Sequence, residues 1–216
     1  MTNKDCKLLS IGICSLDERK DMLNSILEDF KNQMDEETEK KVEIIVNADG
    51  GEKLVGQKRN EILEQANGKF ISFVDDDDKV DSSYIKEIVN IIENNDDLDC
   101  IGFSGKYYIH GKFIMVFKHA NKYGSSYTDD EGIQYRTINH INPTRTEIVK
   151  QIKFLEQNFG EDSDYCNRLL DSGLLKNEII LDKVMYHYFW DTEVTKTHEV
   201  VRQKEVKEFM SKLKET

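Results

Sequence analysis

The sequence has little proline, no closely spaced cysteine pair and no long apolar run. Pro143 is the single proline in 216 residues, which excludes a proline-rich linker. The four cysteines form no CxxC pair and show no metal-ligand spacing: Cys6, Cys14, Cys100 and Cys166. No segment approaches the roughly 18 apolar residues of a membrane helix, and the first residues contain no apolar signal segment. We therefore expect a protein of a reducing, cytoplasmic compartment that does not span a membrane.

The sequence also has no stripe of basic residues. Its formal net charge is −12, and the acidity peaks at residues 75–78 and 93–99. Proteins that bind duplexes normally carry a basic surface that displaces counterions from phosphates, so no nucleic-acid partner is expected. An acidic protein can still bind an anionic nucleotide when a divalent cation lies between them.

The first hundred residues alternate between two hydrophobic patterns. Short apolar runs, partly β-branched, are typical of buried strands and lie at residues 7–15, 42–48 and 69–74. Segments with apolar side chains at helical spacing follow each of them, at residues 22–30, 54–66 and 84–94. This order predicts an α/β fold with a mostly parallel central sheet and helices on both faces.

After residue 99 the pattern changes to shorter strands. Strands are expected at residues 100–105, 106–110, 113–117, 137–142 and 182–188, and helices at 144–149, 161–170 and 199–214. Residues 123–135 are rich in glycine, serine and acidic side chains, which predicts an irregular, mobile loop. With no repeat and no linker, we expect a single domain over residues 1–216.

Four consecutive aspartates, Asp75 to Asp78, end the third apolar strand. In open α/β sheets, ligands collect at the carboxyl ends of strands. Adjacent carboxylates repel each other, so they need a cation, a solvated turn or both. Mg²⁺ and Mn²⁺ are commonly held by one or two carboxylates together with substrate phosphates. An EF-hand is a poor alternative, because Asp81 stands where a loop counted from Asp76 requires glycine.

Three further features carry two interpretations each. Glu161 and Asp162 begin an expected helix, where they either cap it or supply a general base. His187 lies in the last expected strand as a core residue or a metal ligand. Lys58 and Arg59 stand at a helix start, where the dipole disfavours cations, so they either face a bound anion or belong to a solvated face.

In combination these segments resemble glycosyltransferase family 2, which has the GT-A fold. The matching segments, in chain order, are LLSIGICSLDER, VEIIVNADGG and GQKRNEILEQANGKFISFVDDDD. GEDSDYCNRLL resembles the ED motif of that family, and HINP and YHY resemble later elements of its small members, including those of large DNA viruses or phages. The resemblance implies a nucleotide-binding half at residues 1–99, an acceptor half at 100–190 and a C-terminal helix at 191–216.

The resemblance also implies a role for each matching residue. The nucleotide-sugar donor would be bound by Ser15, Arg19, Asp49, Lys58, Arg59, Asp75 and Asp76. Asp75 and Asp77 would form the acidic metal motif, with Asp76 and Asp78 as a second possible frame. The ligands of Mn²⁺ or Mg²⁺ would be Asp77, Asp78 and His187. Asp162 would be the catalytic base, with Glu161 beside it.

The expected reaction is therefore a metal-dependent, inverting transfer of a sugar. The donor would be a nucleotide sugar of the UDP type, and the acceptor a hydroxyl group of a glycan or another molecule. Two alternatives remain open at this point. A nucleotidyltransferase would use a triphosphate and release pyrophosphate, and a non-catalytic module would bind a nucleotide sugar without turning it over.

Overall fold

The computed structural model describes residues 7–191. The predicted C-terminal helix at residues 199–214 lies outside the described residues. Within residues 7–191, no helix is both long and apolar enough to cross a bilayer.

Three parallel strands form the N-terminal part of the sheet, in the order β2 (Val42–Asp49), β1 (Leu9–Leu16) and β3 (Phe70–Phe73). β1 lies in the middle, and its leucine and isoleucine side chains at positions 9, 11 and 13 are fully buried. The connecting segments are η1 (Asp17–Arg19), α1 (Lys20–Gln33), α2 (Glu36–Lys41), α3 (Val55–Gln65) and, after β3, α4 (Tyr84–Glu93). The predicted βαβαβα order is confirmed.

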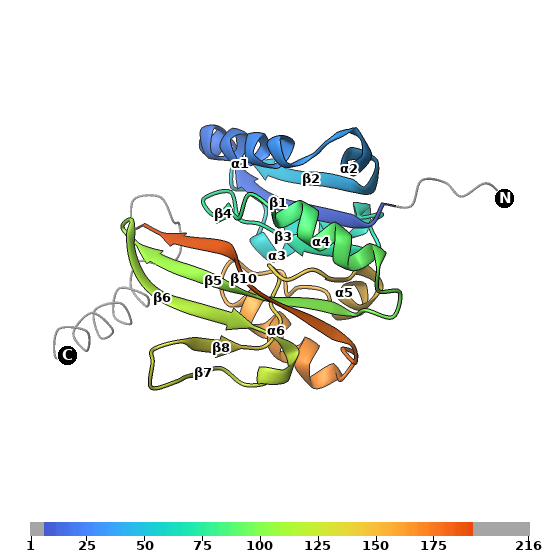
Figure 1. Cartoon of the computed structure of the whole chain (residues 1–216). Helices are drawn as coiled ribbons and strands as arrows, with labels where there is room; N and C mark the ends of the chain where they lie inside the picture. The colour runs from blue at the N-terminus through green and yellow to red at the C-terminus, as the bar shows by residue number, and fades with distance from the viewer. Residues whose placement is uncertain (1–6, 192–216) are drawn as a thin grey trace.

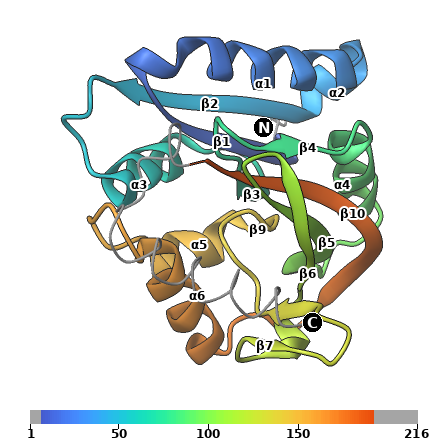
Figure 2. The same cartoon turned by 90° about the vertical axis from the view of Figure 1, so that its left-hand side faces the viewer.

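Helices cover both faces of the sheet (Figures 1 and 2). α1, α2 and α4 lie on one face, and α3, α5 (Thr146–Ile152) and α6 (Glu161–Ser172) lie on the other. Each face has its own core. Ile26, Phe30 and Ile88 belong to the first core, whereas Leu63 and Leu169 belong to the second. Because each helix buries a single apolar stripe, the two sets of helices complete a layered α/β fold.

The second half of the chain extends the same sheet. β5 (Cys100–Ile109) pairs in parallel with the long strand β10 (Glu178–Trp190) and antiparallel with β6 (Lys112–His119). β9 (Thr144–Arg145) joins β3 to β5, and β4 (Lys79–Val80) pairs with β10. The last strand is longer than predicted. β4 follows the aspartate tetrad, so its pairing brings β10 next to the acidic end of β3.

Residues 137–142 do not form the predicted strand. They make a buried turn in which Asn139 N–H donates to Asn142 Oδ1 at 3.0 Å and Asn142 N–H donates to Asn139 O at 3.0 Å. Asparagine side chains compete with strand ladders by bonding nearby backbone, and Pro143 has no N–H to donate to one. The polar turn chemistry of the two asparagines therefore decides the conformation of this segment.

The predicted irregular loop at residues 123–135 is partly ordered as a hairpin. β7 (Tyr127–Thr128) pairs antiparallel with β8 (Gln134–Arg136), which in turn pairs with β6. Tyr127 and Tyr135 stack with ring centroids 4.9 Å apart. The serine and glycine content of the loop predicted flexibility, but cross-strand tyrosine stacking stabilises a hairpin here. The predicted mobility of this segment stays a prediction.

Candidate active site

The aspartate tetrad turns the chain at the carboxyl end of β3, where Asp78 N–H donates to Asp75 O at 3.1 Å. The four side chains divide into a buried pair and a more accessible pair. Asp76 and Asp78 are 3% and 4% exposed. The side chains of Asp75 and Asp77 are 30% and 13% exposed. Of the two frames predicted from the sequence, Asp75 with Asp77 is thus the one that faces solvent.

Asp76 anchors the tetrad to the end of β1. Ser15 Oγ donates to Asp76 Oδ2 at 2.6 Å, and Arg19 forms ion pairs with Asp76 at 2.8 Å and with Asp77 at 2.5 Å. Burial disfavours the charged carboxylate and raises the pKa of Asp76 to about 6. Burial likewise raises the pKa of Asp77, against the opposing charge of Arg19. On this side of the tetrad, two carboxylates therefore share a single arginine.

Asp78 is held by the end of β10. Tyr186 Oη donates to Asp78 Oδ2 at 2.7 Å, and Phe189 N–H donates to Asp78 Oδ1 at 2.7 Å. The same tyrosine hydroxyl accepts from Asp75 N–H at 3.2 Å. Burial raises the pKa of Asp78 well above its usual value. Tyr186 had no predicted role, although its position in a strand facing the tetrad makes it the link between β10 and the site.

Arg59 connects the aspartate tetrad with the acidic residues at the start of α6. From α3 it forms an ion pair with Asp75 at 3.3 Å and a second one with Glu161 at the start of α6. Its guanidinium also lies over the rings of Phe73 and Phe154, at 5.9 and 5.5 Å from their centroids. A buried guanidinium with two carboxylate partners fixes the distance between the tetrad and the helix that carries Asp162.

The carboxyl groups near Arg59 differ in the direction in which their pKa values are shifted. Burial alone would raise the pKa of Asp75, but His140 and Arg59 offset it and hold that pKa well below its usual value. Asp162 behaves in the same way, since burial is outweighed by the charges of His140 and Arg59 and its pKa is lowered. Burial raises the pKa of Glu161 in spite of Arg59. Asp162 is therefore ionised at neutral pH.

Three of the predicted nucleotide-binding side chains, Ser15, Lys58 and Arg59, are each 3% exposed. Lys58 forms an ion pair with Asp49 and donates to Ser15 O at 2.7 Å. Asp49 also accepts from the backbone N–H groups of Gly51 and Lys53, at 3.0 and 2.9 Å. These side chains are therefore bonded to one another and to neighbouring carboxylates, and their predicted contacts with a nucleotide stay predictions.

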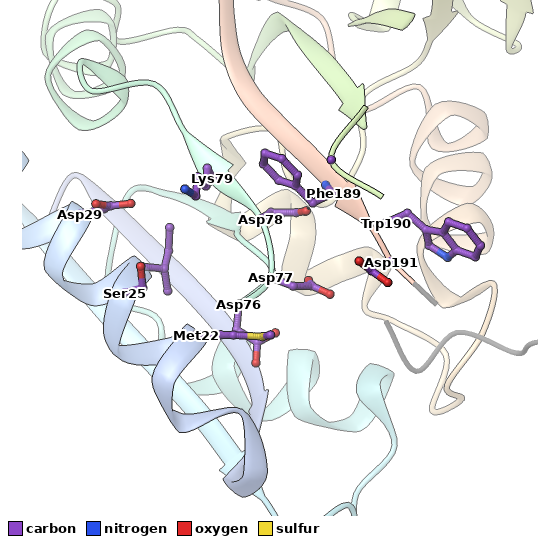
Figure 3. Close-up of a pocket in the computed structure, with 12 residues that line it drawn as sticks. Met22, Ser25, Asp29, Asp76, Asp77, Asp78, Lys79, Phe189, Trp190 and Asp191 are labelled. Atoms are coloured by element: carbon purple, nitrogen blue, oxygen red, sulfur yellow. Dashed lines mark hydrogen bonds between the residues drawn. The ribbon is translucent and has the colours of Figure 1, made fainter. Parts of the chain in front are cut away.

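A cavity of about 290 Å³ lies beside the tetrad (Figure 3). Met22 and Ser25 of α1 form one wall and residues 189–191 another, with residues 76–78 between them. Asp75 is not part of its lining, so the cavity opens on the α1 side of the tetrad. Ser15, Asp49 and Lys58 do not line it either. The tetrad thus separates two regions, this cavity and the side that faces Arg59 and Asp162.

The family described as "Glycosyltransferase like family 2" matches residues 10–205. The chain belongs to this family. Among curated proteins, no match was found. The expected likeness to enzymes of viruses or phages is not tested by these comparisons.

Among solved structures, three of S. aureus TarS (residues 1–349) share the fold. The ligand-free structure has a TM-score of 0.58 at 17% identity, covering 84% of this chain and 60% of that one. The complex with UDP-GlcNAc has a TM-score of 0.61 at 17% identity, covering 85% and 58%. The complex with UDP has a TM-score of 0.60 at 18% identity, covering 85% and 61%. The predicted GT-A fold class is confirmed, and this chain spans about three fifths of the length of those chains.

In this family 2 chain, the structure does not bring the third predicted metal ligand, His187, to the tetrad. Successive side chains of a strand point to opposite faces. Tyr186, which bonds Asp78, and His187 therefore lie on opposite faces of β10. Consistent with this, His187 Nδ1 lies 3.4 Å from the hydroxyl of Tyr108. Within residues 7–191, no three His, Cys, Asp or Glu side chains are grouped as a metal site.

The donor chemistry of the tetrad nevertheless fits a divalent cation bound together with a ligand. Mg²⁺ and Mn²⁺ prefer carboxylate oxygens and commonly use one or two of them plus phosphate oxygens. Both oxygens of Asp78 already accept hydrogen bonds, from Tyr186 and Phe189. Asp76, Asp77 and Asp78 all line the cavity, and Asp77 is the most exposed of the three, because Asp76 and Asp78 are buried. Arg19 pairs with one oxygen of Asp77 at 2.5 Å. By its exposure, Asp77 is the residue of this wall best placed to bind a cation.

Proposed function

We propose that this protein transfers a sugar from a UDP-sugar donor to an acceptor hydroxyl, with inversion at the sugar carbon. The observation that carries the proposal is the Arg59 link, since Arg59 pairs both with Asp75 of the tetrad and with Glu161, the neighbour of Asp162 in the chain. Family membership favours glycosyl transfer over nucleotidyl transfer. Two of the similar structures are complexes of TarS with UDP-GlcNAc and UDP, which supports a donor of that type.

In the proposed reaction the tetrad binds the diphosphate end of the donor through a divalent cation. Asp77 would hold Mn²⁺ or Mg²⁺, which would neutralise the charge of the leaving diphosphate. Asp78 keeps Asp77 in place through its bonds to β10, and Arg19 offsets part of the remaining negative charge. Asp75 lies on the side that faces Asp162, next to the sugar of the donor.

Asp162 would accept the proton of the acceptor hydroxyl as that oxygen attacks the sugar carbon. A general base must be ionised before the reaction, and the lowered pKa of Asp162 meets this condition at neutral pH. Glu161 has a different task, because its ion pair with Arg59 fixes the first turn of α6. One base acting in a single displacement gives inversion.

Two substitutions separate the roles of these carboxylates. Asp77→Asn should weaken UDP-GlcNAc binding and lower the rate of UDP release together, because Asp77 acts on the bound donor. Asp162→Asn should leave binding within about two-fold and lower UDP release by about 10² to 10⁴-fold, the usual contribution of a general base. Binding would be measured by calorimetry, and UDP release by a coupled assay.

Asp164→Asn is the matched control for Asp162, since it lies in the same turn of α6 and pairs with Arg168 at the surface. It should change neither quantity. Near-normal UDP release by Asp162→Asn would rule out the base assignment. Donor binding by the unmodified protein without any UDP release, over a panel of acceptor sugars, would instead indicate a binding module.

A further inference from the structure

His140 is a buried histidine with one ring nitrogen that lacks a hydrogen-bond partner. The residue is 7% exposed, and its Nε2 atom is fully buried. Asp75 Oδ2 lies 3.7 Å from Nε2, within ion-pair range when the ring is protonated but beyond hydrogen-bonding distance. Native proteins rarely leave a buried polar atom unsatisfied, because desolvation is then uncompensated. The orphaned nitrogen therefore indicates that a ligand group or a water completes this position.

The turn at residues 137–142 holds the ring of His140 in one orientation. His140 O accepts from Phe73 N–H at 2.9 Å, which docks the turn on the end of β3. Asn139 Oδ1 lies 2.5 Å from both the backbone nitrogen and Nδ1 of His140. A backbone N–H can only donate, so the facing atom of Asn139 is its oxygen and Nδ1 must carry a hydrogen. Nε2 is thus the end of the ring that is left for a ligand.

The surroundings of Nε2 define the chemistry of that ligand. Asp75 is in contact range, and the charge of His140 also acts on Asp162 and Glu161. Arg59 offsets part of the charge of Asp75 and Glu161, and three carboxylates against this one guanidinium still disfavour an anionic group such as the diphosphate. A hydroxyl group fits, because it can donate to a neutral Nε2 and accept from a protonated one. In the proposed reaction, the uncharged groups that carry hydroxyls are the sugar of the donor and the acceptor.

We propose that His140 binds a hydroxyl group of the sugar carried by the donor, through Nε2, and so helps to select that sugar. This inference rests on the proposed function. The sugar carbon under attack must lie between the leaving diphosphate at the tetrad and the base Asp162. Nε2 of His140 lies 3.7 Å from Asp75, and His140 is near enough to Asp162 to lower the pKa of that residue, so it lies close to both carboxylates between which this sugar has to lie.

Two substitutions of His140 differ in which ring nitrogen they replace. Asparagine can reproduce the Nδ1 contact with Asn139 but does not reach the position of Nε2, whereas the longer glutamine side chain does. Calorimetry with Mn²⁺ would measure the affinity of each protein for UDP and for UDP-GlcNAc. Thermal unfolding would show whether each variant folds, and His140→Phe, which keeps the ring volume, replaces the asparagine variant if that variant is unfolded.

We expect His140→Asn to bind UDP-GlcNAc about ten-fold more weakly and UDP within two-fold of the unmodified protein, as loss of one hydrogen bond implies. His140→Gln should recover UDP-GlcNAc affinity to within about three-fold. An unchanged ratio of the two affinities in His140→Asn overturns the inference and leaves a buried water at Nε2. Failure of the unmodified protein to bind UDP at all contradicts the proposed donor, and this inference with it.

Discussion

At the scale of single residues, Arg59 is the group on which the geometry of the site depends. It is 3% exposed and pairs with Asp75 and Glu161, which come from segments about 85 residues apart in the chain. Without the guanidinium, the buried carboxylate of Glu161 and the partly exposed one of Asp75 would lose their shared counterion. Arg59 therefore stabilises the fold as well as the site.

Arg59→Met should lower the free energy of unfolding by about 3 to 5 kcal/mol at pH 7, the usual effect of breaking a buried ion pair. The folded-state pKa of Asp75 lies below its usual value, so this carboxylate contributes stability above pH 4 and loses it as pH falls. Without Arg59 the two carboxyl groups take up protons more readily, so the effect of the substitution should shrink at pH 4. Urea unfolding at both pH values measures this.

Lys53→Met serves as the control for Arg59, because Lys53 pairs with Glu61 at a partly exposed position. A surface pair of this kind contributes at most about 1 kcal/mol. A loss of stability for Arg59→Met that is small, or equal at pH 4 and pH 7, would contradict the role assigned to Arg59.

The contribution of Asp76 to stability changes with pH in the opposite direction to that of Asp75. The unfolded carboxyl loses its proton near pH 3.8 and the folded one near pH 6. The folded state therefore holds more protons between these values, and stability falls as pH rises through this window. Asp76→Asn removes this loss and keeps an acceptor for Ser15. It should be more stable than the unmodified protein by about 1 to 3 kcal/mol above pH 6, and the difference should disappear near pH 4.

Thermal unfolding from pH 4 to pH 8 in the presence of a chelator measures the Asp76 effect. Curves for the two proteins that run parallel across this range would show that the ion pair with Arg19 fully offsets the burial of Asp76.

At the scale of elements, the start of α3 is docked on the loop that precedes α6. Gly56 N–H donates to Gln157 O at 3.1 Å, and the side chain of Asn60 exchanges hydrogen bonds of 2.9 Å with the backbone of Phe154. A Cβ atom on Gly56 would collide with the carbonyl oxygen of Leu155. This close approach sets the distance over which Arg59 reaches the first turn of α6.

Gly56→Ala should therefore separate α3 from the loop and strain the Arg59 link. We expect a loss of about 1 to 3 kcal/mol in unfolding free energy, as for other overpacked positions, together with a lower rate of UDP release. Gly111→Ala would not be a suitable control, because alanine is strained at a φ of +73°. At Gly56, by contrast, the loss of stability comes only from the steric contact with Leu155. Unchanged stability in urea unfolding would show that the loop moves aside freely.

The elements that the sequence predicts well are those with a single strong pattern. β1 is buried along most of its length and α1 and α4 each bury an apolar stripe, and their predicted ranges, like that of α3, differ from the structure by a few residues. Residues 137–142 were predicted wrongly because side-chain hydrogen bonds of Asn142, to Asn139 N–H and to Ile101 O, form a turn in place of a strand. Local hydrogen bonding of this kind depends on the docking partner, which the sequence alone does not show.

At the scale of the whole molecule, the motifs of the site were predictable and their contacts were not. The sequence indicates the tetrad and Asp162, because each acidic group stands at the end of a recognisable element. It does not show that Asp78 is bonded by β10, that Arg59 bridges two carboxylates, or that His187 points to the other face of β10. Those contacts depend on the pairing of β4 with β10 and on the docking of α3, which join residues far apart in the chain.

The chain as a whole carries a net charge of −12, and its most acidic wall lines the cavity beside the tetrad. Such a wall repels a diphosphate unless a cation lies between them. We therefore expect binding of the nucleotide at the proposed donor site to depend on a divalent cation.

Titration calorimetry of UDP tests this central claim most directly. It would be run with the unmodified protein in Mn²⁺, with the same protein in a chelator, and with Asp77→Asn in Mn²⁺; Asp96→Asn, which changes a side chain that is 99% exposed, is the control. We predict binding by the unmodified protein and the control in Mn²⁺, and affinity at least about ten-fold weaker in the other two cases. Equal affinity in all four titrations would contradict a metal-bound donor at the tetrad.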